Sequence, residues 1–310
     1  MSNTRPPRRP LTGERARIAT RMRSLNSRVN ERSGRNLLSA IGIGVALVTV
    51  LLGSLLIDKR WIVVTGTLLV LALVIELATA MRDAGRHVPR VPSALVPLAV
   101  VPLGFYYGPA WQWGSLLIGL LVVTAWQAVS QLVARQRLSS SFSGDVTSSV
   151  FVQLYATFVG SFTALLVAQP EGELWALSFV IVVICVDTGA YVFGMRYGRT
   201  PLAPRISPSK SWEGIAGGGL TAIGAAVLAS IFILDLPWWF GIIMGIALTV
   251  TAVAGDLTES MVKRDLGRKD MSNWLPGHGG FFDRFDSMLP SGAMAFALYF
   301  WATPLMQFNW

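Results

Sequence analysis

Hydrophobic residues in this chain fall into long runs that short polar segments separate. A helix needs about 20 apolar residues to cross the roughly 30 Å hydrocarbon core of a bilayer. Nine such runs predict an all-α fold, that of a polytopic integral membrane protein. The short run at 94–110 contains Pro97 and Pro102, so a re-entrant segment is an alternative there. The predicted spans are residues 37–57, 61–81, 94–110, 114–134, 149–169, 174–195, 214–234, 237–255 and 288–308.

The positions of the basic residues give an independent prediction of topology, because cytoplasmic segments of membrane proteins carry an excess of Lys and Arg. With the N-terminus in the cytoplasm, the segments predicted to be cytoplasmic carry all but two of the 26 basic residues. The two exceptions are Lys59 and Arg60. Nine spans then place the C-terminus outside, in a multi-pass protein of the cell membrane.

Composition agrees with this class of protein. The chain is 53% hydrophobic and only 14% charged, well below the quarter of charged residues that is usual in soluble domains. The net charge of +9 follows from the topology, so it predicts no nucleic-acid partner. Residues 1–36 read as a basic cytoplasmic tail that can lie on anionic lipids, and residues 37–308 as a single membrane domain.

Charged residues gather in the polar connection between the last two predicted spans. Asp256 and Asp283 fall at the cytoplasmic ends of these spans, and Asp286 follows closely. Carboxylates are suitable ligands for Mg²⁺, which completes its shell with phosphate oxygens and water. The glycines at 277, 279 and 280 would let backbone amides approach phosphate. The combination favours phosphoryl or nucleotidyl transfer at the inner membrane surface over a merely solvated loop.

Two further groups lie on the same predicted side. Asp187 is an acid inside the span 174–195, where an unpaired carboxylate costs roughly 2 to 3 kcal/mol at mid-membrane. A hydrogen bond between helices is the structural alternative for Asp187. Lys210 lies in a hydroxyl-rich turn before the next span, a pattern typical of an anion site. Glu76 and His87 have no evident partner in the sequence and read as structural or solvated.

Three motifs resemble those of one enzyme family, the phosphatidate cytidylyltransferases or CDP-diacylglycerol synthases. The longest is Ser260-x-x-Lys263-Arg264-x4-Lys269-Asp270-x5-Pro276-Gly277-His278-Gly279-Gly280-x2-Asp283-Arg284-x-Asp286. Two earlier motifs are Asp187-Thr-Gly-Ala-Tyr191 and Ser207-Pro-x-Lys210-Ser-x-Glu213-Gly214, in which Ser211 stands where Thr is expected. The resemblance covers residues 187–286, which would form the catalytic region facing the cytoplasm.

The resemblance implies that CTP and phosphatidic acid react to give CDP-diacylglycerol and pyrophosphate with Mg²⁺, and it leaves a second cation such as K⁺ open. Bilayer lipids are implied partners, and a homodimer is compatible with the glycine-rich spans. By motif position Asp256 and Asp283 would hold the metal, and geometry adds Asp187 and Asp286. Lys263 joins the catalytic set of Asp256, Asp283 and Asp187. The expected substrate-binding residues are Ser209, Lys210, Ser260, Arg264, His278, Gly279, Gly280 and Arg284.

Two other functions compete with this interpretation. One is another membrane transferase that uses CTP or CDP-alcohols, but the acid expected at 287 and the DGxxAR block of CDP-alcohol transferases are missing from the sequence. The other is a transporter without enzymatic activity. A transporter would place its charges at mid-membrane in both halves of the chain, whereas these charges gather at one face.

Overall fold

The computed structural model describes residues 46–47, 49–55, 57–134, 142–275 and 279–306, and most of them are helical. The predicted tail at 1–36 lies outside the described residues, as does much of the first predicted span. The described residues between 46 and 57 are helical. The chain then leaves the helix at Asp58 and turns at Lys59 and Arg60.

Six helices among the described residues are long and apolar enough to cross a membrane, and each coincides with a predicted span. One of them is a continuous helix in which η1 (Gln153–Val159), a π-helical stretch, separates α6 (Phe142–Val152) from α7 (Gly160–Val167). The other five are α3 (Trp61–Asp83), α5 (Pro109–Ala134), α8 (Gly172–Tyr197), α9 (Trp212–Phe232) and α10 (Trp238–Asp265). A mostly helical membrane protein is therefore confirmed, while nine spans and the orientation of the termini stay predictions.

Two more helices occupy predicted spans without being among those six. α4 (Arg90–Tyr107) continues through both Pro97 and Pro102, and α12 (Met288–Met306) contains Pro304. A proline inside a helix removes one backbone hydrogen bond, and packing against neighbouring helices can offset the loss. α4 packs against both α3 and α5, which fits a helix that tolerates two prolines.

The structure departs from the predicted elements at two places near the charged clusters. The eighth predicted span ends at 255, whereas α10 continues to Asp265 and carries Asp256 inside the helix. The fold is also not entirely helical, because β1 (Pro201–Ala203) and β2 (Ser207–Ser211) form an antiparallel hairpin. The hairpin precedes α9, and the Ser211 Oγ caps that helix by accepting a hydrogen bond from the Gly214 amide at 3.1 Å.

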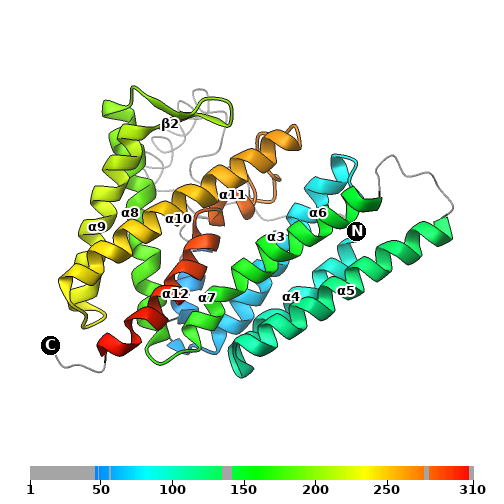
Figure 1. Ribbon diagram of the computed structural model, residues 1–310, viewed down its shortest axis with the longest axis horizontal. Coiled ribbons are helices and arrows are strands. Elements are labelled where there is room, and N and C mark those ends of the chain that lie inside the picture. Colours follow the sequence, from blue (N-terminus) through cyan, green and yellow to red (C-terminus); the bar gives the residue numbers. More distant parts are fainter. Residues whose placement is uncertain (1–45, 48, 56, 135–141, 276–278, 307–310) are drawn as a thin grey trace, which may run out of the picture.

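The helices pack around three hydrophobic clusters, the smallest of which joins α4 to α5. In Figure 1, α8, α9 and α10 stand together below the β hairpin, α4 and α5 lie at the other side, and α7 and α12 lie between. The first cluster joins α8, α9, α10 and α12 and includes Trp175, Phe240 and Leu248. The second joins α3 to η1 and to α11 (Phe282–Phe285) and includes Leu77 and Phe282, both fully buried.

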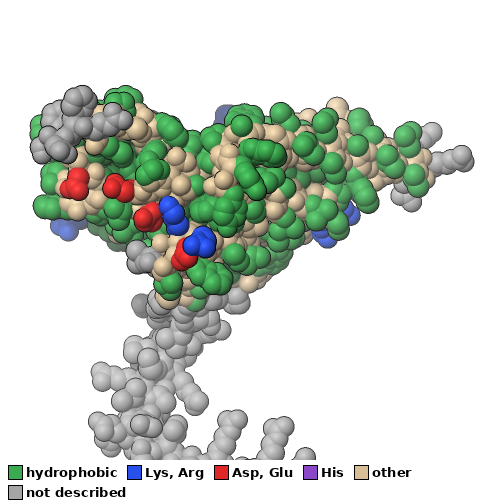
Figure 2. Space-filling view, turned by 90° about the horizontal axis from the view of Figure 1, so that it is seen from below, with side chains coloured by type: hydrophobic (Ala, Val, Ile, Leu, Met, Phe, Trp, Pro, Cys, Tyr) green, Lys and Arg blue, Asp and Glu red, His purple; other side chains and the backbone are tan. Residues whose placement is uncertain are grey.

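Much of the outer surface is apolar, as expected of a protein in contact with lipid chains. Hydrophobic side chains cover most of the face drawn in Figure 2, and charged side chains on it are few. α5 exposes a series of large apolar residues, among them Leu121, Trp126 and Leu132. In water such a surface would drive association, whereas a bilayer solvates it.

Candidate active site

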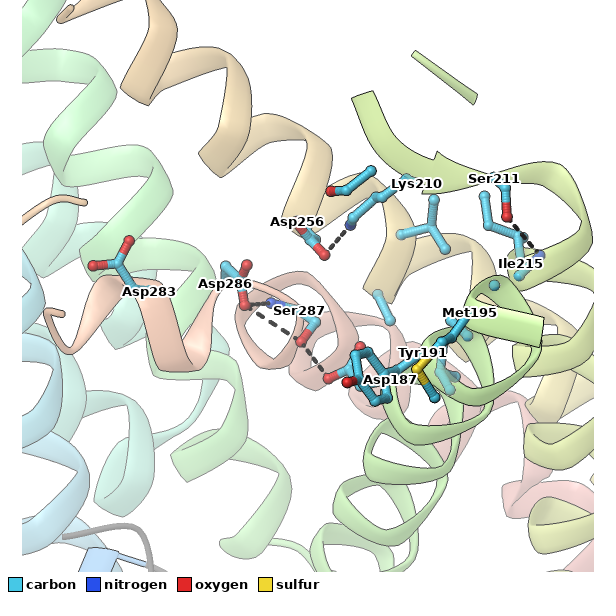
Figure 3. A pocket seen from close by; sticks show the side chains of 17 residues that line it. Asp187, Tyr191, Met195, Lys210, Ser211, Ile215, Asp256, Asp283, Asp286 and Ser287 are labelled. Carbon is cyan, nitrogen blue, oxygen red and sulfur yellow. Dashed lines mark hydrogen bonds and ion pairs between the residues drawn. The ribbon is translucent and has the colours of Figure 1, made fainter. Parts of the chain in front are cut away.

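A cavity of about 530 Å³ opens where four separate stretches of the chain meet, and polar residues from each of the three motifs line it. Asp187 reaches it from α8, Lys210 from β2, Asp256 from α10 and Asp283 from α11, with Asp286 in the turn before α12. Figure 3 shows these side chains around one space. Residues separated by up to 99 positions in the chain thus share one site.

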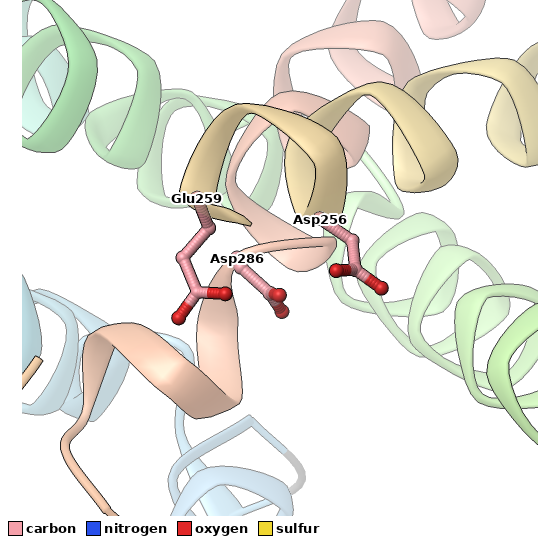
Figure 4. A group of neighbouring side chains, drawn as sticks. All are labelled: Asp256, Glu259 and Asp286. Carbon is pink, nitrogen blue, oxygen red and sulfur yellow. The ribbon is translucent and has the colours of Figure 1, made fainter. Parts of the chain in front are cut away.

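Three carboxylates converge at this site closely enough to share a cation. One oxygen each from Asp256, Glu259 and Asp286 lies within 4.8 Å of the other two. Figure 4 shows the Asp286 side chain between the two side chains that descend from α10. Glu259 was not among the residues expected from the sequence. The signal that points to it is its position three residues after Asp256, which places both acids on one face of a helix.

A glycine on α10 permits this convergence. A Cβ atom at Gly255 would lie 2.3 Å from the backbone oxygen of Asp286, closer than real Cβ contacts allow. Any larger residue would push the turn that carries Asp286 away from α10. The neighbouring Ser287 holds the turn to α8 as well, because its Oγ donates to Asp187 Oδ2 at 3.1 Å and its amide donates to Asp286 Oδ1 at 2.8 Å. Asp187 therefore accepts a hydrogen bond from the turn before α12 rather than from a second helix, and this bond lies at the cavity.

The β hairpin carries a lysine over the acidic group. Lys210 forms an ion pair with Asp256 in the present structure (Figure 3). The hairpin is fixed at its base, where Glu213 Oε2 accepts hydrogen bonds from the amides of Arg199 and Thr200, each at 3.1 Å. Burial lowers the pKa of Lys210, while the carboxylates of Asp286 and Asp187 act in the opposite direction. Burial raises the pKa of Asp286. The hydrogen bond from the Ser287 amide and the positive charges of Lys210 and Lys263 act in the opposite direction.

Asp283 lines the same cavity, but its carboxylate points away from Asp256 in Figure 3. Its Oδ2 accepts hydrogen bonds from the Gly280 amide at 2.8 Å and from the Met271 amide at 3.1 Å. Its Oδ1 lies 3.1 Å from Lys263 Nζ, which also contacts Glu259 at 2.6 Å. Asp283 thus ties both ends of the loop 271–280 to the lysine that neighbours the acidic group.

The other residues expected at the site lie at varying positions. Ser209 lines the cavity. Lys263, Arg264 and Ser260 are on α10 outside the cavity lining, and Arg264 Nε donates to the Ile206 carbonyl of the hairpin turn at 3.3 Å. Gly279 and Gly280 are buried and Arg284 is exposed. His278 lies outside the described residues.

Comparisons with known proteins agree with this arrangement. Residues 38–302 match the profile of the cytidylyltransferase family. The chain is similar to the phosphatidate cytidylyltransferase of Mycobacterium bovis, with 33% identity over 94% of each chain. It is also similar to the enzyme of the same name from Mycobacterium leprae, with 35% identity over 86% of this chain and 88% of that relative. The phosphatidate cytidylyltransferase of Haemophilus influenzae is 43% identical over 43% of this chain and 48% of its own length.

Proposed function

The chain belongs to the cytidylyltransferase family, and we propose that it transfers the CMP group of CTP to phosphatidic acid, with Mg²⁺, at the cytoplasmic face of the cell membrane. The products are CDP-diacylglycerol and pyrophosphate. One observation carries the assignment of the site: a single cavity gathers Asp187, Lys210, Asp256, Asp283 and Asp286 from four separate stretches of the chain, and each of the three motifs contributes to it. The excess of basic residues on the same predicted side supports the cytoplasmic placement.

The reaction needs no nucleophile from the protein. An oxygen of the phosphatidate phosphate forms a bond to the α-phosphorus of CTP, and the bond from that phosphorus to the β-phosphate oxygen breaks. The departing oxygen keeps the electron pair and leaves as part of pyrophosphate. The chain must therefore bring two polyanions together in line and neutralise their charge, which is catalysis by positioning and electrostatics.

The acidic group fits a hard divalent cation. Its donors are all carboxylate oxygens, the type that Mg²⁺ prefers. Among the residues that the structure describes, Glu259 Oε1 is buried and has no hydrogen-bond partner, and an unsatisfied buried oxygen is costly unless a ligand completes it. Asp256, Glu259 and Asp286 would hold the ion, with Asp187 and Asp283 at the rim of the same cavity. When bound, Mg²⁺ would polarise the phosphate oxygens and offset their repulsion by the carboxylates.

The basic residues would bind the phosphates from two directions. Lys210 enters from the hairpin and Lys263 from α10, and each already lies beside a carboxylate of the site. A lysine is a compact charge with three donors, so it can pass from a carboxylate to a phosphate oxygen with little movement. Arg264 joins α10 to the hairpin turn and would keep the two lysines at a fixed separation.

The lipid would reach the site sideways from the bilayer. The α8 side of the cavity is lined by Val186, Tyr191 and Met195, and the last two are 69% and 71% exposed. Apolar side chains at the opening of a polar cavity suit a substrate with a charged head and two acyl chains. We propose that the acyl chains stay in the membrane beside α8 while the phosphate enters the cavity.

The central experiment incubates the purified protein in phosphatidate-containing vesicles with labelled CTP and Mg²⁺. Formation of a CDP-lipid together with an equal amount of pyrophosphate is the expected result. Another CTP-dependent transferase would require a different lipid acceptor, and a transporter would move a solute without consuming CTP. Either of those results would replace the proposed function.

Lys210→Ala is expected to raise the apparent KM for one of the two substrates by about tenfold, with a smaller change in kcat, if Lys210 mainly binds the ground state. Initial rates measured at varied CTP and at varied phosphatidate would identify the substrate. Lys59→Ala is the matched control, because Lys59 is an exposed lysine on the opposite predicted side. Unchanged KM values for both substrates would mean that Lys210 binds neither of them and only contributes to the positive charge of the cytoplasmic side.

Glu259→Gln is expected to raise the Mg²⁺ concentration needed for half-maximal activity by about tenfold or more, because the ion loses one charged ligand. The substitution keeps the size of the side chain, so saturating Mg²⁺ should restore part of the activity. A variant with the parent's Mg²⁺ dependence would remove Glu259 from the ligand set.

A further inference from the structure

Glu76 is a buried acid of α3 for which the sequence suggested no partner, yet the structure gives it two. Only 1% of the residue is exposed. Its Oε1 accepts a hydrogen bond from Ser272 Oγ at 2.6 Å, and its Oε2 accepts one from the Phe282 amide at 2.9 Å. Ser272 belongs to the loop before α11 and Phe282 is the first residue of α11, both about 200 positions further along the chain. Of the two interpretations offered for Glu76, structural or solvated, its burial excludes the solvated one and leaves the structural one.

The loop is shaped to receive this carboxylate. A Cβ atom at Gly280 would lie 1.4 Å from Glu76 Oε1, so no residue other than glycine fits there while Glu76 stays in place. The backbone amide of Phe282 binds Glu76, and the side chain of Phe282 is fully buried in the cluster that contains Leu77. A second contact follows about two turns later on α3, where Asp83 forms an ion pair with Arg268 at 2.6 Å.

Two carboxylates therefore bind both ends of the same loop. Asp283 binds the amides of Met271 and Gly280, and Glu76 binds the adjacent Ser272 and Phe282. Each acid joins one residue near the start of the loop to one near its end. Because the Phe282 amide immediately precedes Asp283, the bond to Glu76 also fixes the position from which Asp283 reaches Lys263.

We propose that Glu76 is a positioning residue, which holds Ser272 and Phe282, near either end of the loop 271–280, against α3 so that Asp283 and Lys263 stay aligned at the active site. α3 belongs to the part of the chain in which no family motif was found. The inference gives that part a defined role in the reaction and rests on the proposed function for its kinetic readout. A carboxylate is suited to this role, because two acceptor oxygens on one rigid group can hold two donors at a fixed separation.

The experiment compares Glu76→Ala, Glu76→Gln and Ser272→Ala with the parent protein in the same vesicles. Glu76→Ala removes both acceptors, and we expect kcat to fall by about tenfold to a hundredfold through misplacement of the loop. Glu76→Gln keeps one oxygen and should lie between the parent and Glu76→Ala. Ser272→Ala removes one of the two hydrogen bonds to Glu76, together with a longer one that the Trp274 amide donates to Ser272 Oγ at 3.3 Å, and should have the smallest effect. KM for CTP should change less than kcat in all three variants.

Hydrogen exchange supplies a readout that does not depend on activity. We expect faster exchange in peptides covering residues 279–283 of the Glu76 variants, with unchanged exchange in α4 and α5. Thr67→Val is the matched control, because Thr67 is a buried polar residue of α3 whose hydroxyl donates to the Val63 carbonyl of the same helix. This control should keep both the kinetics and the exchange of the parent.

Unchanged exchange at 279–283 in Glu76→Gln and Ser272→Ala would overturn the proposal, even if Glu76→Ala failed to fold. A fall in activity that only matches a fall in the amount of folded protein would overturn it too, because that result describes general stability. Absence of CDP-lipid formation by the parent protein is a different failure. It would refute the proposed function, while the exchange data would still test whether Glu76 holds the loop.

Discussion

Asp256→Asn is expected to lower CDP-lipid formation by about a hundredfold or more, because the change removes a charged metal ligand from the centre of the site. Asp256 contributes to the three-carboxylate group and also pairs with Lys210. Asparagine keeps the shape of the side chain, so the helix and its insertion should not change. The measurement is the initial rate per amount of inserted protein, repeated over a range of Mg²⁺ concentrations.

Asp265→Asn is the matched control for that variant. Asp265 is the last residue of the same helix, and its ion pair with Arg86 is largely exposed. Exposed ion pairs contribute about 0 to 1 kcal/mol, so activity should stay near that of the parent. If Asp256→Asn also kept near-normal activity at every Mg²⁺ concentration, the acidic group would not be the metal site.

The positions of the helices could be predicted from sequence because each depends on a local property. A run of about 20 apolar residues must form a helix to satisfy its backbone in lipid, and α3, α5 and α8 lie where such runs predict them. The end of α10 was misplaced because Asp256 and the charged residues after it continue the helix beyond the apolar run. The hairpin before α9 was missed because β1 and β2 are three and five residues long and carry no alternating apolar pattern.

The site was predictable to the extent that its residues sit in local motifs. Asp187, Lys210 and Asp286, which belong to the three motifs, line one cavity together with Asp256. Glu259 was overlooked because a single acid in a charged helix end resembles a solvated residue. Only its burial, with 2% of the residue exposed, distinguishes Glu259 from a solvated residue.

Glu76 illustrates the limit more clearly. An acid inside an apolar span marks a functional candidate, but hydropathy says nothing about a partner some 200 residues away. The two donors of Glu76 are a serine hydroxyl and a backbone amide. A backbone amide is present at almost every position, so no residue type in the loop identifies the partner. Long-range contacts of this kind follow from tertiary packing alone.

Asp283→Asn is expected to lower kcat by about a hundredfold, and the reason can be traced to each oxygen of the carboxylate. Oδ2 holds the amides of Gly280 and Met271, and Oδ1 faces Lys263. An asparagine must turn its amide nitrogen toward one of these donor sets, so either the loop or the lysine loses its acceptor. The measurement is kcat at saturating CTP and phosphatidate.

The Mg²⁺ dependence of the same variant separates two roles that Asp283 can have. If Asp283 is a metal ligand, as its motif position implies, the Asp283→Asn variant would require more Mg²⁺ for activity, as the Asp256→Asn variant would. If Asp283 instead holds Lys263 and the loop, the variant would lose kcat at an unchanged Mg²⁺ requirement. Asp235→Asn is the control, because Asp235 lies on the opposite predicted side at a positive φ of 49°, where asparagine is well tolerated. Near-normal turnover of Asp283→Asn would exclude both roles, and the alignment of Lys263 would then have to come from Glu259 alone.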